Sequence, residues 1–205
     1  MTIDDMMRLA PVIPVLVIEQ DIDPVALAEA LVAGGLPVIE VTLRTPNALS
    51  AMRAMAKVEG AIVGAGTVLD ETMLGIAIDA GARFVVSPGL TDPLARAAIA
   101  SGVPFLPGIA TAGDIMRGLD HGLKRFKFFP AEAAGGLPAL KALAGPFGDI
   151  LFCPTGGIRE ETASQWLAHP AVLCVGGSWI LPAGERDMAA VTARARVAAG
   201  LRAAR

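Results

Sequence analysis

The chain has 205 residues, a length that suits one α/β domain and leaves little room for a second. Hydrophobic residues make up 54% of it, which excludes a disordered protein and is enough for a large core. The formal net charge of −3 comes from acids and bases spread along the chain, which argues against nucleic-acid binding but not against a small anionic substrate.

Residues 4–9 are predicted to form a short helix, and eight strand-like runs follow it along the chain. These runs are rich in Val, Ile and Phe, and several are almost continuously apolar, as expected of strands buried on both faces. They span residues 12–18, 37–43, 61–67, 83–89, 104–110, 125–131, 149–157 and 171–179. The segments between them, such as 24–34 and 92–102, are rich in Ala and Leu and often end in Gly, which indicates helices.

This alternation repeats about every 20 to 25 residues, with no linker and no change of composition. Eight β-α units at that spacing predict a (β/α)₈ barrel, or TIM barrel, as a single domain over residues 1–205, with the N-terminal helix covering its bottom. A doubly wound open sheet is the alternative, because strand order is not visible in a sequence. In a barrel the active site lies at the C-terminal ends of the strands.

The most unusual residue is Lys127, because it alone of the four lysines falls inside a predicted strand, between phenylalanines in RFKFFPAE. Burial disfavours the charged form of an amine. The neutral form is the one that attacks a ketone carbonyl to form a Schiff base. The alternative is a buried lysine paired with an acid for structural reasons.

The run PVIEVTLRT (37–45) alternates between apolar and other residues. Its apolar set fits against the helix layer, which turns Glu40, Thr42 and Arg44 towards the barrel axis. Lys127 faces the same interior if its phenylalanine neighbours point outward. Glu40 is then suited to carry protons and Arg44 to bind a carboxylate. The alternative for these two residues is a structural ion pair.

Three further segments end strands at the same edge. Thr67 follows GAG, where its hydroxyl would reach the same cavity, whereas GAG by itself is only weakly similar to a nucleotide-binding loop. The triplets TGG (155–157) and GGS (176–178) end the last two strands. Free glycine N–H groups in such loops are typical of the phosphate site of a barrel, and simple tight turns are the alternative.

Other classes of site and location fit poorly. The two histidines, His121 and His169, are isolated, so we expect no metal, no cofactor and no Ser-His-Asp triad. The N-terminus carries acids and no long apolar stretch, and no 18-residue apolar window occurs, so we expect no signal peptide and no membrane partner. Cys153 and Cys174 lie in apolar runs, where buried thiols are the expectation. A cytoplasmic location follows.

Five strings resemble those of the bacterial 2-keto-3-deoxy-6-phosphogluconate (KDPG)/4-hydroxy-2-oxoglutarate (KHG) aldolases. They are EVTLRT (40–45), GAGTVL (64–69), KFFPAE (127–132), CPTGGI (153–158) and VGGSW (175–179). They occur in the family's order and spacing between about residues 8 and 182. The resemblance implies a class I aldolase on a (β/α)₈ barrel, a homotrimer that needs no metal and acts on a small 2-keto acid or sugar-acid phosphate.

The resemblance also implies roles for individual residues. The Schiff-base lysine falls on Lys127 and the general acid/base on Glu40. The ligands of the pyruvate carboxylate fall on Arg44 and Thr67. The reaction implied is reversible cleavage of 2-dehydro-3-deoxy-6-phosphogluconate to pyruvate and glyceraldehyde 3-phosphate.

The rest of the pocket follows from the same comparison. Phe129 matches the aromatic residue beside the lysine, and Pro88 matches a position that lines the pocket. The positions that hold the far end and the phosphate of the substrate fall on Thr155, Gly156, Gly157, Gly177 and Ser178.

Three alternatives remain open on the sequence. An aldolase that prefers KHG or the galactonate epimer of KDPG would share the lysine and the glutamate and differ at the distal end. A non-catalytic barrel that binds a phosphate ligand would have lost Lys127 or Glu40, and neither is lost. An isomerase or epimerase would use carboxylates or histidine without an imine-forming lysine.

Overall fold

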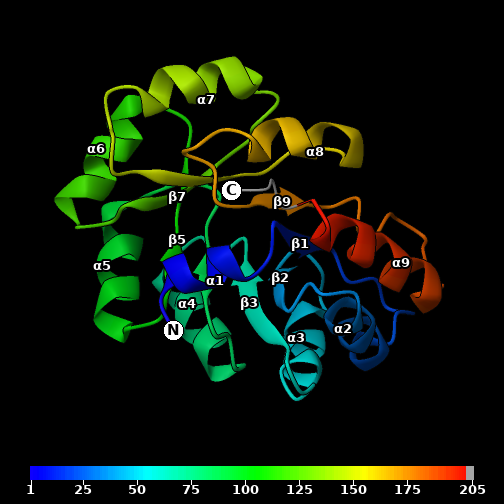
Figure 1. Ribbon diagram of the computed structural model, residues 1–205. Helices are drawn as coiled ribbons and strands as arrows, with labels where there is room; N and C mark the ends of the chain where they lie inside the picture. The colour runs from blue at the N-terminus through cyan, green and yellow to red at the C-terminus, as the bar shows by residue number, and fades with distance from the viewer. Residues whose placement is uncertain (202–205) are drawn as a thin grey trace.

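A computed structural model describes residues 1–201, in which α-helices surround parallel strands (Figure 1). The strands are β1 (Val12–Leu16), β2 (Val38–Thr42), β3 (Ile62–Gly66), β4 (Val85–Val86), β5 (Phe105–Leu106), β6 (Gly108–Ile109), β7 (Arg125–Phe128), β8 (Leu151–Pro154) and β9 (Val175–Gly177). The helices are α1 (Ile3–Leu9), α2 (Pro24–Ala33), α3 (Ala48–Met55), α4 (Glu71–Asp79), α5 (Asp92–Ser101), α6 (Ala112–Asp120), α7 (Gly136–Ala144), α8 (Glu160–Leu167) and α9 (Met188–Ala199). The predicted domain over 1–205 therefore extends four residues, 202–205, beyond the described part.

The paired strands run parallel and form two sheets. One sheet has six strands in the order β5-β4-β3-β2-β1-β9, and the other has three in the order β6-β7-β8. Two isolated parallel bridges, Thr155↔Gly176 and Phe152↔Val172, connect β8 and its end to the segment that contains β9. The α/β class is thus confirmed, and the strands within residues 1–201 form a curled six-stranded sheet beside a three-stranded one.

The predicted strand over 104–110 is wrong as a single strand, because it divides into β5 and β6 at Pro107. Val85 of β4 pairs with Phe105 of β5, whereas Gly108 of β6 pairs with Lys127 of β7. Proline has no N–H and interrupts a ladder of hydrogen bonds. The Pro107 carbonyl still accepts a hydrogen bond from the Lys127 N–H at 2.8 Å, so this short segment joins the two sheets.

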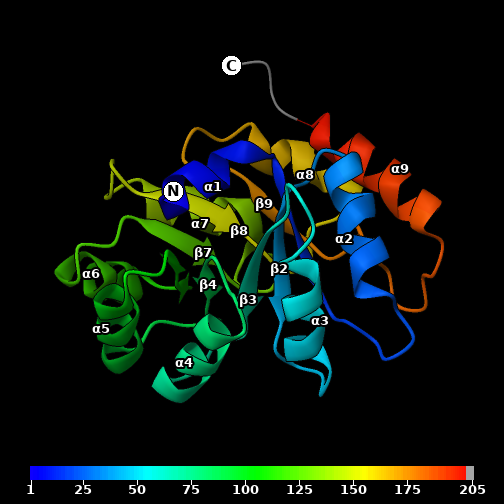
Figure 2. The ribbon, with the colours of Figure 1, turned by 90° about the horizontal axis from the view of Figure 1, so that it is seen from below.

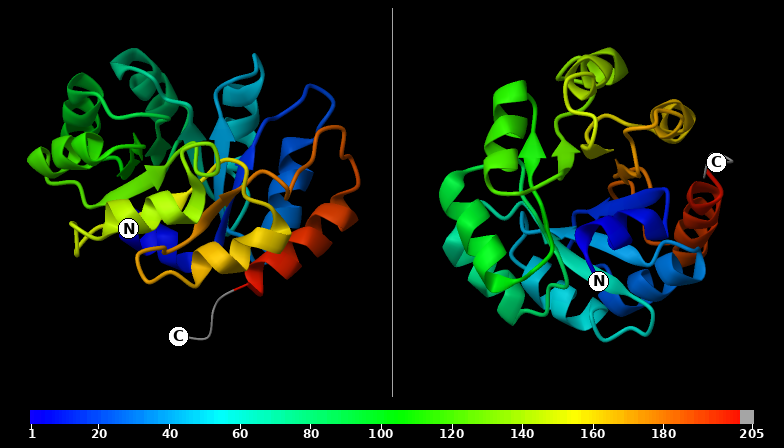
Figure 3. Two further views of the ribbon diagram at one scale, coloured as in Figure 1. Left: turned by 90° about the horizontal axis from the view of Figure 1, so that it is seen from above. Right: turned by 60° about the vertical axis from the view of Figure 1, so that its left-hand side comes forward.

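The helices lie around the outside of the strands, with α2, α3 and α9 on one side and α4, α5 and α6 on the other (Figures 2 and 3). Alternate strand residues face this layer, and Ile39, Val41 and both Phe126 and Phe128 belong to the large cluster packed against the helices. None of the helices within residues 1–201 combines the length and the hydropathy needed to cross a membrane.

A second, smaller cluster fills the space enclosed by the strands. Val38 and Phe84 contribute to it from β2 and the start of β4, and Met6 and Met7 contribute from α1. The N-terminal helix is thus confirmed, and its burial of two methionines explains why it packs against the strands. The interior also holds buried polar side chains, among them Glu40, Thr42 and Lys127.

Candidate active site

Lys127 and Glu40 contact each other in the interior of the molecule. Lys127 Nζ donates to Glu40 Oε1 at 2.9 Å and lies 3.3 Å from Oε2. The exposed fractions of the two side chains are 7% and 4%. An amine and a carboxylate are therefore in hydrogen-bond contact in a place from which water is nearly excluded.

The contact joins the two sheets. Glu40 lies on β2, inside the six-stranded sheet, whereas Lys127 lies on β7, the central strand of the other. Lys127 turns inward because its neighbours Phe126 and Phe128 pack outward, where the ring of Phe128 lies 6.3 Å from that of Trp166. The alternation expected from the sequence is confirmed on both strands.

A purely structural explanation of this pair is weak on energetic grounds. Desolvation of two charges offsets most of their attraction, so a buried ion pair is a poor device for stability. The pair also lies beside an aromatic ring, with Lys127 Nζ 5.5 Å from the centre of the Phe129 ring. Such an arrangement can release a neutral, nucleophilic amine when Glu40 takes a proton from it.

Arg44 and Thr67 lie just beyond the ends of adjacent strands. Thr42 of β2 is level with Gly66 of β3, and the Leu43 N–H donates to the Gly66 carbonyl at 2.9 Å. Arg44 is exposed, and no acid within residues 1–201 forms an ion pair with it, whereas Glu40 pairs with Lys127. Its guanidinium is available to an anionic ligand at this edge.

Thr67 has an unusual backbone conformation. Its φ of 62° lies in the left-handed region, which a β-branched residue rarely occupies. Such a residue costs about 1–3 kcal/mol and is most common at functional sites. The strain is consistent with a constraint on where the Thr67 hydroxyl points.

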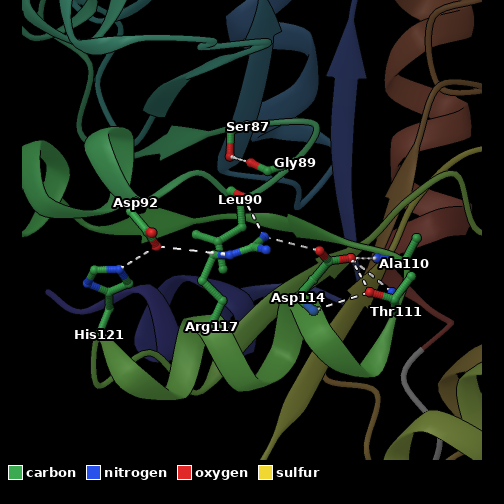
Figure 4. A network of polar contacts seen from close by, with 9 residues as sticks. All are labelled: Ser87, Gly89, Leu90, Asp92, Ala110, Thr111, Asp114, Arg117 and His121. Atoms are coloured by element: carbon green, nitrogen blue, oxygen red, sulfur yellow. Dashed lines mark hydrogen bonds and ion pairs between the residues drawn. The ribbon is translucent and has the colours of Figure 1, made fainter.

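A network of polar contacts holds the loop after β4 against α6 (Figure 4). The Ser87 hydroxyl donates to a carbonyl two residues on at 2.6 Å, and Arg117 Nη1 donates to the Leu90 carbonyl at 3.2 Å. His121 lies 3.0 Å from Asp92, and this hydrogen bond lowers the pKa of Asp92 below its ordinary value of 3.8. His121 thus takes part in a contact between α6 and α5.

The loop held in this way carries Pro88. A side chain at Gly108 would place its Cβ 2.1 Å from the Pro88 carbonyl oxygen, so the loop rests directly on β6. Because Gly108 is the strand partner of Lys127, Pro88 lies one strand away from the lysine. The structure therefore places Pro88 beside the strand that carries the candidate nucleophile.

The end of β8 lies on the other side of Lys127. Thr155 is buried, and it occupies space left by Gly176, whose added Cβ would lie 2.2 Å from Thr155 Oγ1. Gly156 packs against the Phe129 ring and has a φ of 103°, which favours glycine. Thr155 and Gly156 therefore lie between the strand that carries the lysine and the glycines at the end of β9.

A cleft of about 540 Å³ lies between the loops that follow β1, β8 and β9. Gly157 and Ser178 line it, and Gly177 is buried beside it under the ring of Trp179. Val15, which also lines the cleft, is the strand partner of Glu40. Two of the expected distal residues, Gly157 and Ser178, therefore share a cleft that begins one strand from Glu40.

The charge of this cleft comes from Arg159 and Glu19. Glu19 forms an ion pair with Arg186, in which Arg186 Nη2 lies 2.5 Å from Glu19 Oε2. Arg159 is exposed, and it has no acidic partner in the described part of the chain. The unpaired charge in the cleft is thus positive, as a phosphate or carboxylate would require.

Sequence reasoning missed two residues. Arg159 follows the TGGI string at position 155–158, and an exposed arginine after a loop has no signal of its own. Gly66 lies inside GAGT, a string that carries the family resemblance but in which the sequence assigns a site role only to Thr67. The missing signal was spatial, because β3 lies beside β2 and Gly66 faces Glu40 across that pairing.

The chain is similar to known proteins along most of its length. The sequence model of the family described as KDPG and KHG aldolase matches residues 3–194. The 2-dehydro-3-deoxy-phosphogluconate aldolase of Zymomonas mobilis subsp. mobilis is 58% identical over 200 residues, which cover 98% of this chain and 96% of that protein. The KHG/KDPG aldolase of Escherichia coli is 53% identical over 181 residues, which cover 88% and 85% of the two chains.

A solved structure is also similar along nearly the whole chain. The KDPG aldolase of Legionella pneumophila, with pyruvate captured at low pH as a covalent carbinolamine intermediate, has a TM-score of 0.92 at 43% identity. The match covers 96% of this chain and 97% of that one.

Proposed function

The chain belongs to the KDPG and KHG aldolase family, and from that membership we propose that Lys127 is its nucleophile and Glu40 its proton carrier. It is a class I aldolase that cleaves 2-dehydro-3-deoxy-6-phosphogluconate to pyruvate and glyceraldehyde 3-phosphate. The observation that supports these residue roles most directly is the buried contact of 2.9 Å between Lys127 Nζ and Glu40 Oε1.

The reaction begins at the keto carbon, C2. Glu40 takes a proton from the Lys127 ammonium, and the lone pair of the resulting amine attacks C2. The attacking nitrogen then passes a proton to the oxygen on C2, which gives a neutral carbinolamine. Loss of water, with Glu40 returning the proton to the departing hydroxyl, gives a protonated imine. The imine then serves as the electron sink for cleavage of the C3–C4 bond.

Cleavage and release use the same two groups. Glu40 accepts the proton of the C4 hydroxyl as C4 becomes the aldehyde of glyceraldehyde 3-phosphate, and the bonding electrons form an enamine on pyruvate. Glu40 then delivers that proton to C3. Hydrolysis of the imine frees pyruvate and restores the Lys127 amine.

The pyruvate carboxylate lies at the ends of β2 and β3. Arg44 binds it as a planar pair of donors, and the Thr67 hydroxyl adds a third. Phe129 and Pro88 line the sides of the pocket. By fixing the carboxylate, these residues present C2 to the lysine. Positioning of this kind can lower the activation free energy by several kcal/mol, up to about 7–11 kcal/mol.

The distal end of the substrate lies in the cleft beyond β8 and β9. The backbone around Gly156, Gly157 and Gly177 and the Ser178 hydroxyl donate to the phosphate, with Thr155 beside C4. Arg159 supplies the positive charge. 4-Hydroxy-2-oxoglutarate presents a carboxylate instead, and the same cation suits it, which makes KHG cleavage to pyruvate and glyoxylate the second activity. The galactonate epimer of KDPG is the alternative substrate, since it differs only at C4.

The chain folds as one closed (β/α)₈ barrel. The bridge from Thr155 to Gly176 supports closure between β8 and β9, and Pro107 supports it between β5 and β6. The enzyme acts in the cytoplasm as a homotrimer. Light scattering tests the assembly, with an expected mass of three times the 21.0 kDa of one chain and a contradiction if one chain is found.

A side-by-side assay tests the function. The purified chain is given KDPG, its galactonate epimer and 4-hydroxy-2-oxoglutarate, and pyruvate is measured together with the aldehyde product. We expect the highest kcat/KM with KDPG and equal amounts of pyruvate and glyceraldehyde 3-phosphate. Lys127→Ala should abolish all three activities, and Lys141→Ala, a lysine on α7, should leave them unchanged. Turnover by Lys127→Ala would contradict the proposal.

A further inference from the structure

Gly66, the last residue of β3, faces the carboxylate of Glu40. A Cβ added at Gly66 would lie 2.2 Å from Glu40 Oε1, 2.7 Å from its Cγ and 2.8 Å from its Cδ. Distances this short do not occur between such atoms, so one group would have to move. The three nearest atoms all belong to Glu40, and no backbone atom is among them.

The backbone does not require glycine at this position. The φ of Gly66 lies outside the left-handed region, unlike that of Thr67, which follows it. Any residue could adopt the strand conformation there. The need for glycine therefore comes from the space that the Glu40 side chain occupies.

Glu40 has little freedom to occupy another place. Its side chain is 4% exposed, and both of its oxygens lie within 3.3 Å of Lys127 Nζ. Oε1 is both the oxygen nearest to Lys127 and the atom nearest to the missing Cβ of Gly66. A methyl group at position 66 would thus displace the very oxygen that contacts the lysine.

A second glycine on the same strand shows that this relation is specific. Gly64 faces the same interior two residues earlier, and its added Cβ would meet the ring of Phe84 at 2.5 Å. Phe84 belongs to the apolar cluster enclosed by the strands. Gly64 therefore makes room for core packing, and Gly66 makes room for a reacting group.

We propose that Gly66 is a positioning residue of the aldolase: the absence of its side chain holds open the space in which Glu40 must lie to exchange protons with Lys127 and the substrate. The proposal rests on the proton-carrying role of Glu40 described above. It assigns to the GAGT string a function in proton transfer, separate from that of Thr67 at the carboxylate.

A double-mutant cycle between positions 66 and 40 tests it. Gly66→Ala should lower kcat about 10²-fold, which is the lower range for loss of general acid/base catalysis. The KM for pyruvate, measured by exchange of its methyl protons with solvent, should change little. Borohydride trapping of pyruvate on Lys127 should also change little. In the Glu40→Ala background the displaced carboxylate is absent, so adding Gly66→Ala should lower the residual activity less than 2-fold, about the error of such an assay.

Gly64→Ala is the matched control. Its effect is on core packing, so it should cost the same factor in the wild-type background and in the Glu40→Ala background. If Gly66→Ala also costs the same factor in both backgrounds, Gly66 is structural and the proposal is wrong. If Gly66→Ala does not fold, folding should be recovered in the double variant with Glu40→Ala, and failure of that recovery would equally overturn the proposal.

The cycle also separates this proposal from the one on which it rests. Full activity of Glu40→Ala alone would show that Glu40 carries no proton and would remove the basis of both. If Glu40→Ala loses activity as expected and Gly66→Ala keeps full activity, only the proposed role of Gly66 is wrong.

Discussion

The two ends of the candidate site differ in how closely the protein packs around their side chains. At one end, Lys127 and Glu40 are buried and already in contact at 2.9 Å. At the other end, Ser178 and Arg159 are exposed and line an open cleft of about 540 Å³. The proposed reacting groups are preorganised inside packed strands, whereas the groups proposed for the distal anion lie on loops. Changes at the first end should therefore affect every substrate, and changes at the second should affect substrates selectively.

The largest effect is expected from Lys127→Ala. Loss of a covalent nucleophile can lower kcat by about 10⁶-fold, and no other lysine within residues 1–201 lies in the interior. The variant also leaves the Glu40 carboxylate buried without its partner, which should destabilise the fold by roughly 3–5 kcal/mol. Cleavage assays and urea denaturation measure the two effects, and Lys127→Met with Glu40→Gln should recover stability without recovering activity.

The next largest effect is expected from Glu40→Gln. The amide keeps the shape of the side chain and cannot carry a proton, so exchange of the pyruvate methyl protons with solvent should slow about 10²–10⁴-fold. Imine formation should still occur, as seen by borohydride trapping. Rapid methyl exchange in this variant, followed by NMR in D₂O, would show that another group moves the proton.

A selective effect is expected from Arg159→Ala. Loss of a charge-assisted contact of about 1.5–3 kcal/mol should raise KM for KDPG roughly 10- to 100-fold. Methyl exchange of pyruvate, which has no distal group, should not change. Arg83→Ala is the control, because Arg83 is an exposed arginine before β4, at the opposite end of the strands. An equal loss with pyruvate would remove the distinction between the two ends.

Thr67→Gly is expected to stabilise the fold and to weaken substrate binding. Glycine adopts the φ of 62° without strain, so the fold should gain about 1 kcal/mol. The same change removes the hydroxyl proposed to bind the carboxylate, so KM should rise for every keto acid. Thermal unfolding and steady-state kinetics measure the two effects, and a loss of stability would show that Thr67 is not strained.

The smallest effect is expected from Asp4→Asn, far from both ends. Hydrogen bonds from Arg8 on the same helix and from Arg125 on β7 lower the pKa of Asp4 below 3.8, against desolvation, which raises it. A lowered pKa in the folded state stabilises the fold above pH 3.8, and this stabilisation is lost as the pH falls through the folded value. The variant should lose about 0.5–1 kcal/mol at pH 7 and less at pH 3, with kcat unchanged.

Much of this arrangement was predictable from local patterns. The alternation in PVIEVTLRT oriented Glu40 inward, and the phenylalanines around Lys127 oriented the lysine, because strand periodicity depends only on neighbouring residues. The helix over residues 4–9 was predictable for the same reason, and the structure extends it by one residue to Ile3.

The remaining features depend on contacts between distant segments. The division of strand 104–110 at Pro107 reflects which neighbour each half meets, and no local pattern contains that information. The space at Gly66 exists because β3 pairs with β2 in one register. Arg159 lies in the cleft only because the loops after β1, β8 and β9 come together in the fold, and a single loop sequence does not show this.

The most direct test of the account is to trap the imine. The chain is incubated with pyruvate and sodium borohydride, digested, and mapped by mass spectrometry. We predict one adduct, an N-(1-carboxyethyl) group on Lys127, formed also by Glu40→Gln and absent from Lys127→Ala. No adduct on the wild-type chain, or an adduct on Lys124 or Lys141 in place of Lys127, would contradict the central claim.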